Sequence, residues 1–414
     1  MILGLVGKEL IHSYSKEIHE AITPDKYALM SLSEEELVSF LEKRNFQGVN
    51  VTIPYKQTVI PYLDEIDLNA KKIGAVNTIV NNNGIIKGYN TDYIGFKTLL
   101  DRHNITIKGK RCLILGSGGT SKMIFNVLKD LDAFIIAVAS RNPQKKMISY
   151  DDLHHQYFDI IINATPVGMY PNDNVSPLDI SIMKNVETVI DVIYNPVRTR
   201  LMLDALSLGI KTYGGLRMLV EQAFYSHELF FNTKYDELIK EEIMNKIFYS
   251  KLNIALIGMP ASGKTSIATL LGKRLSKKVF DTDETIINIE GKSINDIFLN
   301  QGEEKFRQME TKVIECIDNS GIIVATGGGI VKNEANMISL KSKCLVFYIK
   351  RDKDNIILSN DRPLCSNMEK WESLQNERDN LYNKYADYII DNNSTLEKAV
   401  EEIIKNYNEY IKEE

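Results

Sequence analysis

Residues 258–265 are the part of this sequence whose chemistry is easiest to predict. They read Gly-Met-Pro-Ala-Ser-Gly-Lys-Thr, which fits G-x-x-x-x-G-K-[ST], between a predicted strand at 253–257 and a predicted helix. Backbone N–H groups of such a loop and of the helix that follows bind phosphate, because the aligned peptide dipoles favour negative charge. We expect Lys264 to reach the β- and γ-phosphates of a nucleotide, and Thr265 to bind Mg²⁺ through its hydroxyl.

Several segments after this loop could hold the group that accepts the phosphate. Phe280-Asp281-Thr282-Asp283 ends the next apolar segment, and an extended backbone would place both carboxylates on one side of the chain. Four further segments combine arginines, carboxylates and glycines, at 302–310, 327–329, 362–364 and 378–387. One such arginine alone would more often be a surface ion-pair partner, so it is the ordered set that suggests a site.

In this order the segments resemble the shikimate kinase family, over residues 252–390. Its D-x-D, G-E-x-x-F-R-x-x-E, G-G-G, R-P-L and R-x-x-x-Y-x-x-x-A-D motifs all occur here. The resemblance implies that shikimate binds to Asp283, Arg307, Gly328 and Arg378, and two arginine forks suit a carboxylate. It also implies that Asp283 takes the proton from the attacking hydroxyl, with Lys264 as the second catalytic residue, and that Asp281 lies near Mg²⁺ through water.

The same resemblance implies a set of ATP-binding residues, with Arg362 on a mobile lid. The set comprises Ala261, Ser262, Gly263, Lys264, Thr265, Ser266 and Arg362. Ala261 departs from the family, which usually has a glycine there, and we expect a small effect because the general pattern accepts any residue.

A second glycine turn, at 116–119, follows a predicted strand at 111–115 and precedes a predicted helix at 120–131. Its third pattern position is Ser121 rather than glycine, so the turn alone is a weak sign of dinucleotide binding. The end of the next strand, at 134–139, is more informative. NAD-binding proteins place an acid there for the ribose 2′-hydroxyl, whereas this chain has Arg141 and Lys145. We therefore predict NADP(H), the alternative being an ordinary solvated basic loop.

Four segments before this turn resemble the shikimate dehydrogenase family. They are His-Ser-Tyr-Ser at 12–15, Asn-Val-Thr-Ile-Pro-Tyr-Lys at 50–56, Gly-Ala-Val-Asn-Thr at 74–78 and Asn-Thr-Asp at 90–92. The match covers residues 1–232 and continues through 163–169, 191–196 and 215–223. It departs from the family at Lys16, Glu20 and Arg200.

The resemblance implies that Lys56 and Asp92 are the catalytic pair, which positions and supplies a proton while hydride passes from NADPH to a carbonyl. A lysine suits this role because burial and neighbouring groups tune its pKa. The implied ligands of shikimate or 3-dehydroshikimate are Ser13, Ser15, Thr52, Asn77, Asp92, Tyr194 and Gln222. The implied NADP ligands are Gly116, Ser117, Gly118, Gly119, Thr120, Ser140, Arg141, Asn142, Lys145, Val192 and Gly215.

Short apolar runs alternate with amphipathic helical patterns along the chain, which predicts an α/β fold with parallel sheets. Strands are expected at 2–6, 48–53, 158–163, 188–192 and 210–213, and helices at 33–44, 216–248 and 396–414. We expect a split α/β substrate domain at 1–92 and 217–248, with a Rossmann-like NADP domain at 93–216 between its parts. A linker at 249–252 then leads to a P-loop α/β kinase domain with a central parallel sheet at 253–414.

The bulk composition limits partners and compartment. The 414 residues carry a net charge of −5, which suggests neither nucleic acid nor an anionic membrane as partner. The four cysteines are scattered, which fits a reducing cytosol and argues against disulfides or a zinc site. No apolar run suggests a signal peptide or membrane span, so we expect a cytoplasmic enzyme of small-molecule substrates. The sequence does not indicate its oligomeric state.

The two halves predict consecutive reactions, because the product of the first is the substrate of the second. We expect reduction of 3-dehydroshikimate to shikimate with NADPH, then phosphorylation to shikimate 3-phosphate with MgATP, towards aromatic amino acids. One alternative is a catalytically dead pathway sensor, which the presence of Lys56, Asp92, Lys264 and Arg307 disfavours. Another is an NAD-linked quinate dehydrogenase joined to a gluconate-type kinase, which the basic cluster at Arg141 disfavours.

Overall fold

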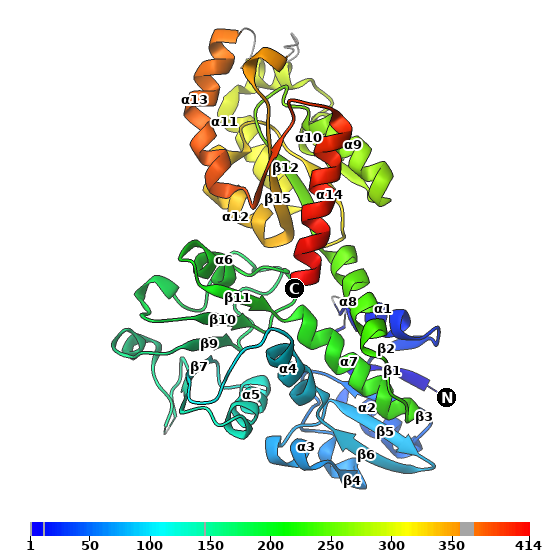
Figure 1. Cartoon of the computed structure of the whole chain (residues 1–414). Helices are drawn as coiled ribbons and strands as arrows, with labels where there is room; N and C mark the ends of the chain where they lie inside the picture. Colours follow the sequence, from blue (N-terminus) through cyan, green and yellow to red (C-terminus); the bar gives the residue numbers. More distant parts are fainter. Residues whose placement is uncertain (1, 11–12, 145, 357–367) are drawn as a thin grey trace. The chain divides into compact units, whose positions relative to one another are not determined.

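The computed structural model describes residues 2–10, 13–144, 146–356 and 368–414 (Figure 1). Its internal contacts divide the chain into two compact units. The first comprises Met1–Gly168, Ser176–Tyr194 and Asp204–Ile247, and the second comprises Met169–Val175, Asn195–Leu203 and Phe248–Glu414. In the described part of the chain, every helix is too short or too polar to cross a membrane.

The first unit begins with a mixed sheet of six strands in the order β2-β1-β3-β5-β6-β4. The strands are β1 (Ile2–Gly7), β2 (Tyr27–Ser31), β3 (Phe46–Val51), β4 (Glu65–Ile66), β5 (Thr78–Asn82) and β6 (Ile85–Tyr89). β1 is parallel to β2 and β3, whereas β5 is antiparallel to β3 and β6. Val6, Phe46 and Ile79 are fully buried in its core.

The predicted helix at 33–44 is confirmed as α2 (Glu34–Lys43), and its start follows from local sequence. The side chain of Ser33 accepts a hydrogen bond from the N–H of Glu36, whose carboxylate accepts the N–H of Ser33. This reciprocal pair satisfies two backbone donors that a helix N-terminus would otherwise leave without partners. The other helices of this part are α1 (Ser15–Ile22) and α3 (Leu68–Ile73).

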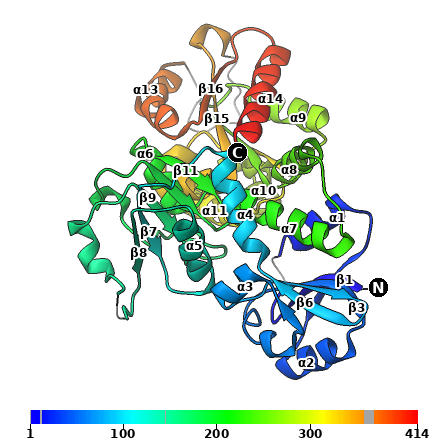
Figure 2. The same ribbon diagram turned by 60° about the horizontal axis from the view of Figure 1, so that its bottom comes forward.

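A second, fully parallel sheet follows in the order β11-β10-β9-β7-β8. Its strands are β7 (Arg111–Leu115), β8 (Ile135–Ala139), β9 (Ile160–Asn163), β10 (Thr188–Asp191) and β11 (Lys211–Gly214). The helices along this stretch are α4 (Thr91–Arg102), α5 (Gly119–Asp130), α6 (Arg200–Ser207) and α7 (Leu216–Phe231). Both views show α4 and α7 side by side (Figures 1 and 2).

The stretch 216–248, predicted as helical, forms two helices rather than one. Asn232 adopts a left-handed conformation with φ 49° and ends α7, and α8 (Glu237–Lys251) follows after a short break. Asparagine is one of the few residues that enters this conformation readily, which explains the break.

The second unit has a fully parallel sheet in the order β13-β14-β12-β15-β16. Its strands are β12 (Asn253–Ile257), β13 (Val279–Asp281), β14 (Ile323–Ala325), β15 (Cys344–Lys350) and β16 (Tyr388–Asp391). Its helices are α9 (Lys264–Leu275), α10 (Thr282–Glu290), α11 (Ile294–Glu315), α12 (Glu334–Lys343), α13 (Met368–Tyr385) and α14 (Leu396–Glu413). Trp371, Tyr348 and Tyr382 are the largest side chains buried in its core.

Two candidate active sites

Lys56 and Asp92 meet in the first unit, as the sequence suggested. Lys56 follows β3 in a turn, and Asp92 lies in the first turn of α4, whose N-cap Asn90 accepts the N–H of Tyr93. Lys56 Nζ lies 2.6 Å from Asp92 Oδ2, and the two side chains keep 26% and 18% of their surface exposed. A carboxylate at a helix N-terminus is stabilised by the peptide dipoles. The pair can therefore hold an ammonium group in a fixed place that solvent and a ligand still reach.

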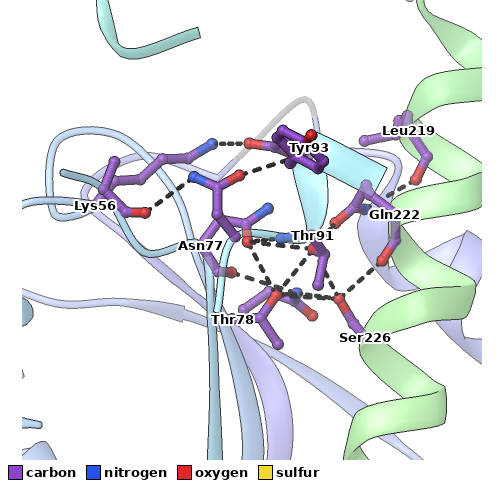
Figure 3. Close-up of polar contacts among 12 residues, drawn as sticks. Lys56, Asn77, Thr78, Thr91, Tyr93, Leu219, Gln222 and Ser226 are labelled. Atoms are coloured by element: carbon purple, nitrogen blue, oxygen red, sulfur yellow. Dashed lines mark hydrogen bonds and ion pairs between the residues drawn. The ribbon is translucent and has the colours of Figure 1, made fainter. Parts of the chain in front are cut away.

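Thr91, the residue before Asp92, is bonded to two amide side chains, those of Asn77 and Gln222 (Figure 3). Both residues are buried. Asn77 Oδ1 accepts the backbone N–H of Thr91 at 2.7 Å, and Thr91 Oγ1 donates to Gln222 Oε1 at 3.1 Å. Gln222 Nε2 in turn donates to the carbonyl of Leu219 at 2.9 Å. The structure thus connects two predicted substrate ligands from distant parts of the sequence.

The other predicted substrate ligands lie on loops of the same unit. Ser13 Oγ accepts the backbone N–H of Ser15 at 3.2 Å. The ring of Tyr14, between these serines, lies 5.2 Å from the ring of Tyr194, which brings this segment next to another predicted ligand. Burial raises the pKa of the Tyr194 phenol, so the group stays protonated and can donate a hydrogen bond. Thr52 follows β3 and donates its backbone N–H to β1.

The predicted pyrophosphate turn joins β7 to α5. Gly116 adopts φ 100°, and a side chain there would meet the carbonyl of Ala164 and the side chain of Thr165, so both conformation and space require glycine. Gly118 is the N-cap of α5, and no atom lies within 4 Å of the place where its β-carbon, or that of Gly119, would be. This open helix N-terminus can take a phosphate group.

The basic segment after β8 lies beside this turn. Ser140 Oγ lies 3.3 Å from Ser117 Oγ and accepts the backbone N–H of Asn142 at 3.3 Å. Arg141, between Ser140 and Asn142 in the sequence, is exposed, so its guanidinium is available to a 2′-phosphate. Lys145 lies outside the described residues.

Val192 and Gly215, predicted to line the nicotinamide, are in direct contact. A β-carbon on Gly215 would overlap the backbone carbonyl of Val192. Gly215 also donates its N–H to the carbonyl of Ile193 at 3.0 Å. The two predicted residues are therefore brought together by a close backbone approach that only glycine permits.

In the second unit, the phosphate loop is held by its own lysine. Lys264 Nζ donates to the carbonyls of Gly258 and Met259 at 2.9 and 2.8 Å. Ala261 adopts φ 66°, a left-handed conformation that costs an alanine about 1 kcal/mol. The predicted effect of the missing glycine is therefore local strain. Gly263 precedes α9, with Ser262 buried beside it and Ser266 exposed in the first helical turn.

Two side chains that sequence reasoning missed support this loop from outside. Trp371 Nε1 donates to the carbonyl of Pro260 at 3.0 Å, and Asn392 Nδ2 donates to the carbonyl of Ser262 at 2.8 Å. Trp371 is the single tryptophan of the chain, which is a signal that could have drawn attention to it. Asn392 gave no signal in the sequence.

The expectation that Asp281 and Asp283 share one side of an extended chain is wrong. β13 ends at Asp281, which becomes the N-cap of α10 and accepts the N–H of Asp283 at 3.0 Å. An aspartate at an N-cap is favourable because it satisfies backbone donors, and this starts the helix one residue before Asp283. Thr265 Oγ1 donates to Asp281 Oδ2 at 3.3 Å.

Thr265 and Asp281 together present a hydroxyl and a carboxylate, the oxygen ligands that Mg²⁺ prefers. Within the described residues, no cluster of three or more His, Cys, Asp or Glu side chains could hold a metal. Mg²⁺ bound by one or two protein oxygens completes its shell with water and phosphate, so these two residues fit an ion that arrives with a nucleotide.

The predicted acceptor residues Asp283 and Arg307 converge with a carboxylate that had been given no role, Glu310. Arg307 Nη1 lies 2.8 Å from Glu310 Oε2, and Arg307 Nη2 lies 3.0 Å from Glu303 Oε1. A β-carbon on Gly327 would lie 2.7 Å from Asp283 Oδ1 and 3.0 Å from Glu310 Oε1. Burial raises the pKa of Glu310 to about 7, although Arg307 opposes the shift.

Arg378 and Gly328 complete this group. The buried Arg378 donates through Nη1 to the carbonyl of Gly328 at 3.1 Å, and the hydroxyl of Tyr382 donates to the same carbonyl. Tyr382 was missed as a site residue, although it lies in the same helical motif as Arg378. Three predicted acceptor residues, Asp283, Arg307 and Arg378, therefore lie against one glycine turn, which contains the fourth, Gly328. Arg362 lies outside the described residues.

Two family models match this chain. One, for shikimate kinase, matches residues 260–408, and the other, for the shikimate dehydrogenase substrate binding domain, matches residues 5–79. The shikimate dehydrogenase (NADP(+)) of Clostridium perfringens strain 13 is 36% identical over 265 residues, covering 59% of this chain and 98% of that protein.

Solved structures agree with the match over the N-terminal part. A chorismate mutase/shikimate 5-dehydrogenase fusion protein from Clostridium acetobutylicum is 40% identical with a TM-score of 0.57, covering 59% of this chain and 96% of that one. A shikimate 5-dehydrogenase from Thermus thermophilus, in complex with NADP(H) and shikimate, is 28% identical with a TM-score of 0.54. It covers 59% of this chain and 98% of that one.

Proposed function

Because this chain belongs to the shikimate dehydrogenase family and also carries a shikimate kinase domain, we propose that it catalyses two consecutive reactions at the two sites described above. The chain is a bifunctional shikimate-pathway enzyme that uses NADP(H) and ATP with Mg²⁺. The first site reduces 3-dehydroshikimate to shikimate, and the second converts shikimate to shikimate 3-phosphate. The 2.6 Å contact between Lys56 Nζ and Asp92 Oδ2 is the observation that supports the first site best.

In the dehydrogenase site, the chain's own residues handle the proton. Bound NADPH supplies the hydride. Asp92 holds the Lys56 ammonium through one oxygen, so that the nitrogen can pass a proton to the oxygen that gains negative charge. Asn77 and Gln222 bind ring hydroxyls, and Ser13 and Ser15 bind the carboxylate end of the substrate.

The NADP residues follow the same reasoning. The open N-terminus of α5 binds the pyrophosphate, and Arg141 pairs with the 2′-phosphate. Val192 and Gly215 line the nicotinamide through backbone that lies close enough to exclude a side chain. Ser117 in the turn and Thr120 in the first turn of α5 offer hydroxyl donors.

In the kinase site, positioning and charge do most of the work. Lys264 leaves the carbonyls of its own loop for the β- and γ-phosphates. Thr265 through its hydroxyl, and Asp281 through water, would hold Mg²⁺, which when bound would neutralise charge on the phosphates. Arg307 and Arg378 bind the carboxylate of shikimate, and Asp283 accepts the proton of the attacking hydroxyl.

We propose the domain boundaries that the sequence suggested. A substrate domain at 1–92 and 217–248 flanks an NADP domain at 93–216, and the kinase domain at 253–414 follows a linker at 249–252. We also propose a reducing compartment, the cytoplasm, since Cys112, Cys316 and Cys344 all carry free thiols. Small molecules are the proposed partners, with neither nucleic acid nor membrane.

Paired lysine variants test this assignment. Lys56→Ala should abolish NADPH oxidation with 3-dehydroshikimate and leave shikimate phosphorylation intact, whereas Lys264→Ala should do the reverse. Lys273→Ala, an exposed lysine on the same helix as Lys264, is the control and should keep both activities. Loss of both activities in either site variant would contradict two independent sites. In a one-pot reaction, NADPH consumption without shikimate 3-phosphate would contradict the kinase assignment.

A further inference from the structure

Three buried hydroxyl groups lie beneath the two amides of the dehydrogenase site. They belong to Thr78 on β5, Thr91 on α4 and Ser226 on α7, and all three residues are fully buried. Their oxygen atoms lie 3.0 to 3.2 Å apart, so each one is within hydrogen-bond distance of the other two (Figure 3). We call these three residues the hydroxyl cluster.

Backbone groups next to the cluster fix how the two amides are turned. A backbone N–H only donates and a backbone carbonyl only accepts. Because the N–H of Thr91 lies 2.7 Å from the amide of Asn77, the oxygen of that amide must face Thr91. Because the carbonyl of Leu219 lies 2.9 Å from the amide of Gln222, the nitrogen of that amide must face Leu219.

This orientation determines the proton of Thr91. The amide oxygens of Gln222 and Asn77 lie 3.1 and 3.2 Å from Thr91 Oγ1, and both only accept. Because the Asn77 oxygen already accepts the N–H of Thr91 and the hydroxyl of Thr78, the Thr91 hydroxyl donates to Gln222. A hydroxyl has one proton. Thr91 can therefore donate to Gln222 only while the hydroxyl oxygens of Thr78 and Ser226 accept their hydrogen bonds from other donors.

Ser226 provides that condition. Its hydroxyl donates to the carbonyl of Gln222 at 2.9 Å and accepts from Asn50 Nδ2 at 2.8 Å. The Asn50 amide is turned this way because the Tyr27 hydroxyl donates to its oxygen at 2.8 Å. Asn50 Nδ2 also donates to Thr78 at 2.9 Å. Asn50 thus donates hydrogen bonds to both Thr78 and Ser226, so neither of them requires the Thr91 proton, which stays directed at Gln222.

We propose that Ser226 is a positioning residue of the dehydrogenase, which acts through the hydroxyl cluster to stabilise the orientation that the backbone gives to Asn77 and Gln222, in which both amides offer N–H groups to the substrate. The proposal rests on the proposed dehydrogenase function. Its consequence is a rule of specificity. The site selects rings whose oxygens accept hydrogen bonds at both positions, because an amide turned the other way would face those oxygens with its own oxygen.

The first test is Ser226→Ala, which removes one oxygen atom. Losing one buried hydrogen-bond partner should raise KM for 3-dehydroshikimate about tenfold, whereas kcat should change less than twofold because Lys56 and Asp92 are untouched. Val220→Ala, a fully buried apolar position on the same helix, is the matched control for loss of packing and should leave KM unchanged. Kinase activity of the same preparation reports on the quantity of chain with a folded kinase part, and a urea titration of the variant reports on the folding of the dehydrogenase part.

Two further variants decide the remaining outcomes. Ser226→Thr keeps the hydroxyl and should restore KM. If Ser226→Ala does not fold, Thr78→Val, which has the shape of threonine without its hydroxyl, should give the same rise in KM. In a Gln222→Ala background, Ser226→Ala should raise KM little further, because both changes disrupt the same hydrogen-bonded group.

An unchanged KM in folded Ser226→Ala, or an equal rise in Val220→Ala, would overturn the positioning role. Failure of the proposed function is a separate result, because the unmodified chain would then not oxidise NADPH with 3-dehydroshikimate at all.

Discussion

Replacing Gly327 with alanine should disable the kinase and spare the dehydrogenase. The new methyl group would lie 2.7 Å from Asp283 Oδ1, about 0.7 Å inside the 3.4 Å at which ordinary contact begins, and 3.0 Å from Glu310 Oε1. Glu310 cannot retreat, because it is fully buried and bound to Arg307 at 2.8 Å. Asp283 must therefore move by most of that distance.

A misplacement of about 1 Å can cost a reaction about 100-fold. We therefore expect kcat for shikimate phosphorylation to fall about 30- to 100-fold in Gly327→Ala. ADP binding, measured by titration calorimetry, should stay within twofold, because the phosphate loop is unchanged. NADPH oxidation should also stay within twofold.

Gly272→Ala is the matched control for this experiment. Its β-carbon would lie 2.7 Å from a methyl of Val279, a similar overlap away from the acceptor residues. Both variants are assayed by coupled ADP release. A phosphorylation rate for Gly327→Ala within twofold of the unmodified chain, or an equal loss in Gly272→Ala, would refute the reasoning.

Three other predictions concern stability. Burial raises the pKa of Glu310 to about 7 from 4.5, so the contribution of its protonation to stability is complete below pH 4.5 and is lost as pH rises to 7. The free energy of unfolding should therefore fall over that window by at most about 3 kcal/mol more in the unmodified chain than in Glu310→Gln. Burial lowers the pKa of His227 to about 4 from 6.5, so stability should fall by a similar amount between pH 6.5 and 4, and urea titrations of His227→Leu should show a weaker fall. Ala261→Gly should raise the melting temperature of the kinase part by about 1–3 °C. The reason is that relief of about 1 kcal/mol of left-handed backbone strain exceeds the entropy that glycine adds to the unfolded chain. A melting temperature below that of the unmodified chain would contradict that strain.

Local signals made much of the fold predictable from sequence. The capping box at Ser33 and Glu36 fixed the start of α2, and the phosphate loop and the glycine turn at 116–119 each lie where the expected strand meets the expected helix. The position of Asp283 was not predictable in the same way, because a residue after an apolar run can continue the strand or start a helix. Here the capping bonds of Asp281 favour the helix.

The hydroxyl cluster lay beyond sequence reasoning for a different reason. Thr78, Thr91 and Ser226 are common polar residues, and Ser226 lies 135 positions from Thr91. Only the packing of α7 against α4 shows that they are buried together. The roles of Glu310 and Tyr382 were not predictable for a similar reason: each lies inside a recognised segment, and only the fold brings it next to the glycine turn at 327–329.

The bonds that Lys264 makes to Gly258 and Met259 have a consequence for which nucleotides can occupy the loop. Lys264 is only 7% exposed, and two carbonyl oxygens already accept hydrogen bonds from its ammonium group. A nucleoside or a monophosphate offers little to replace them, whereas a β- and γ-phosphate together offer stronger charge-assisted bonds. Lys264 therefore distinguishes nucleotides by their number of phosphates. Nucleosides and monophosphates leave its bonds to Gly258 and Met259 intact and bind loosely, whereas a triphosphate replaces those carbonyls as its partner.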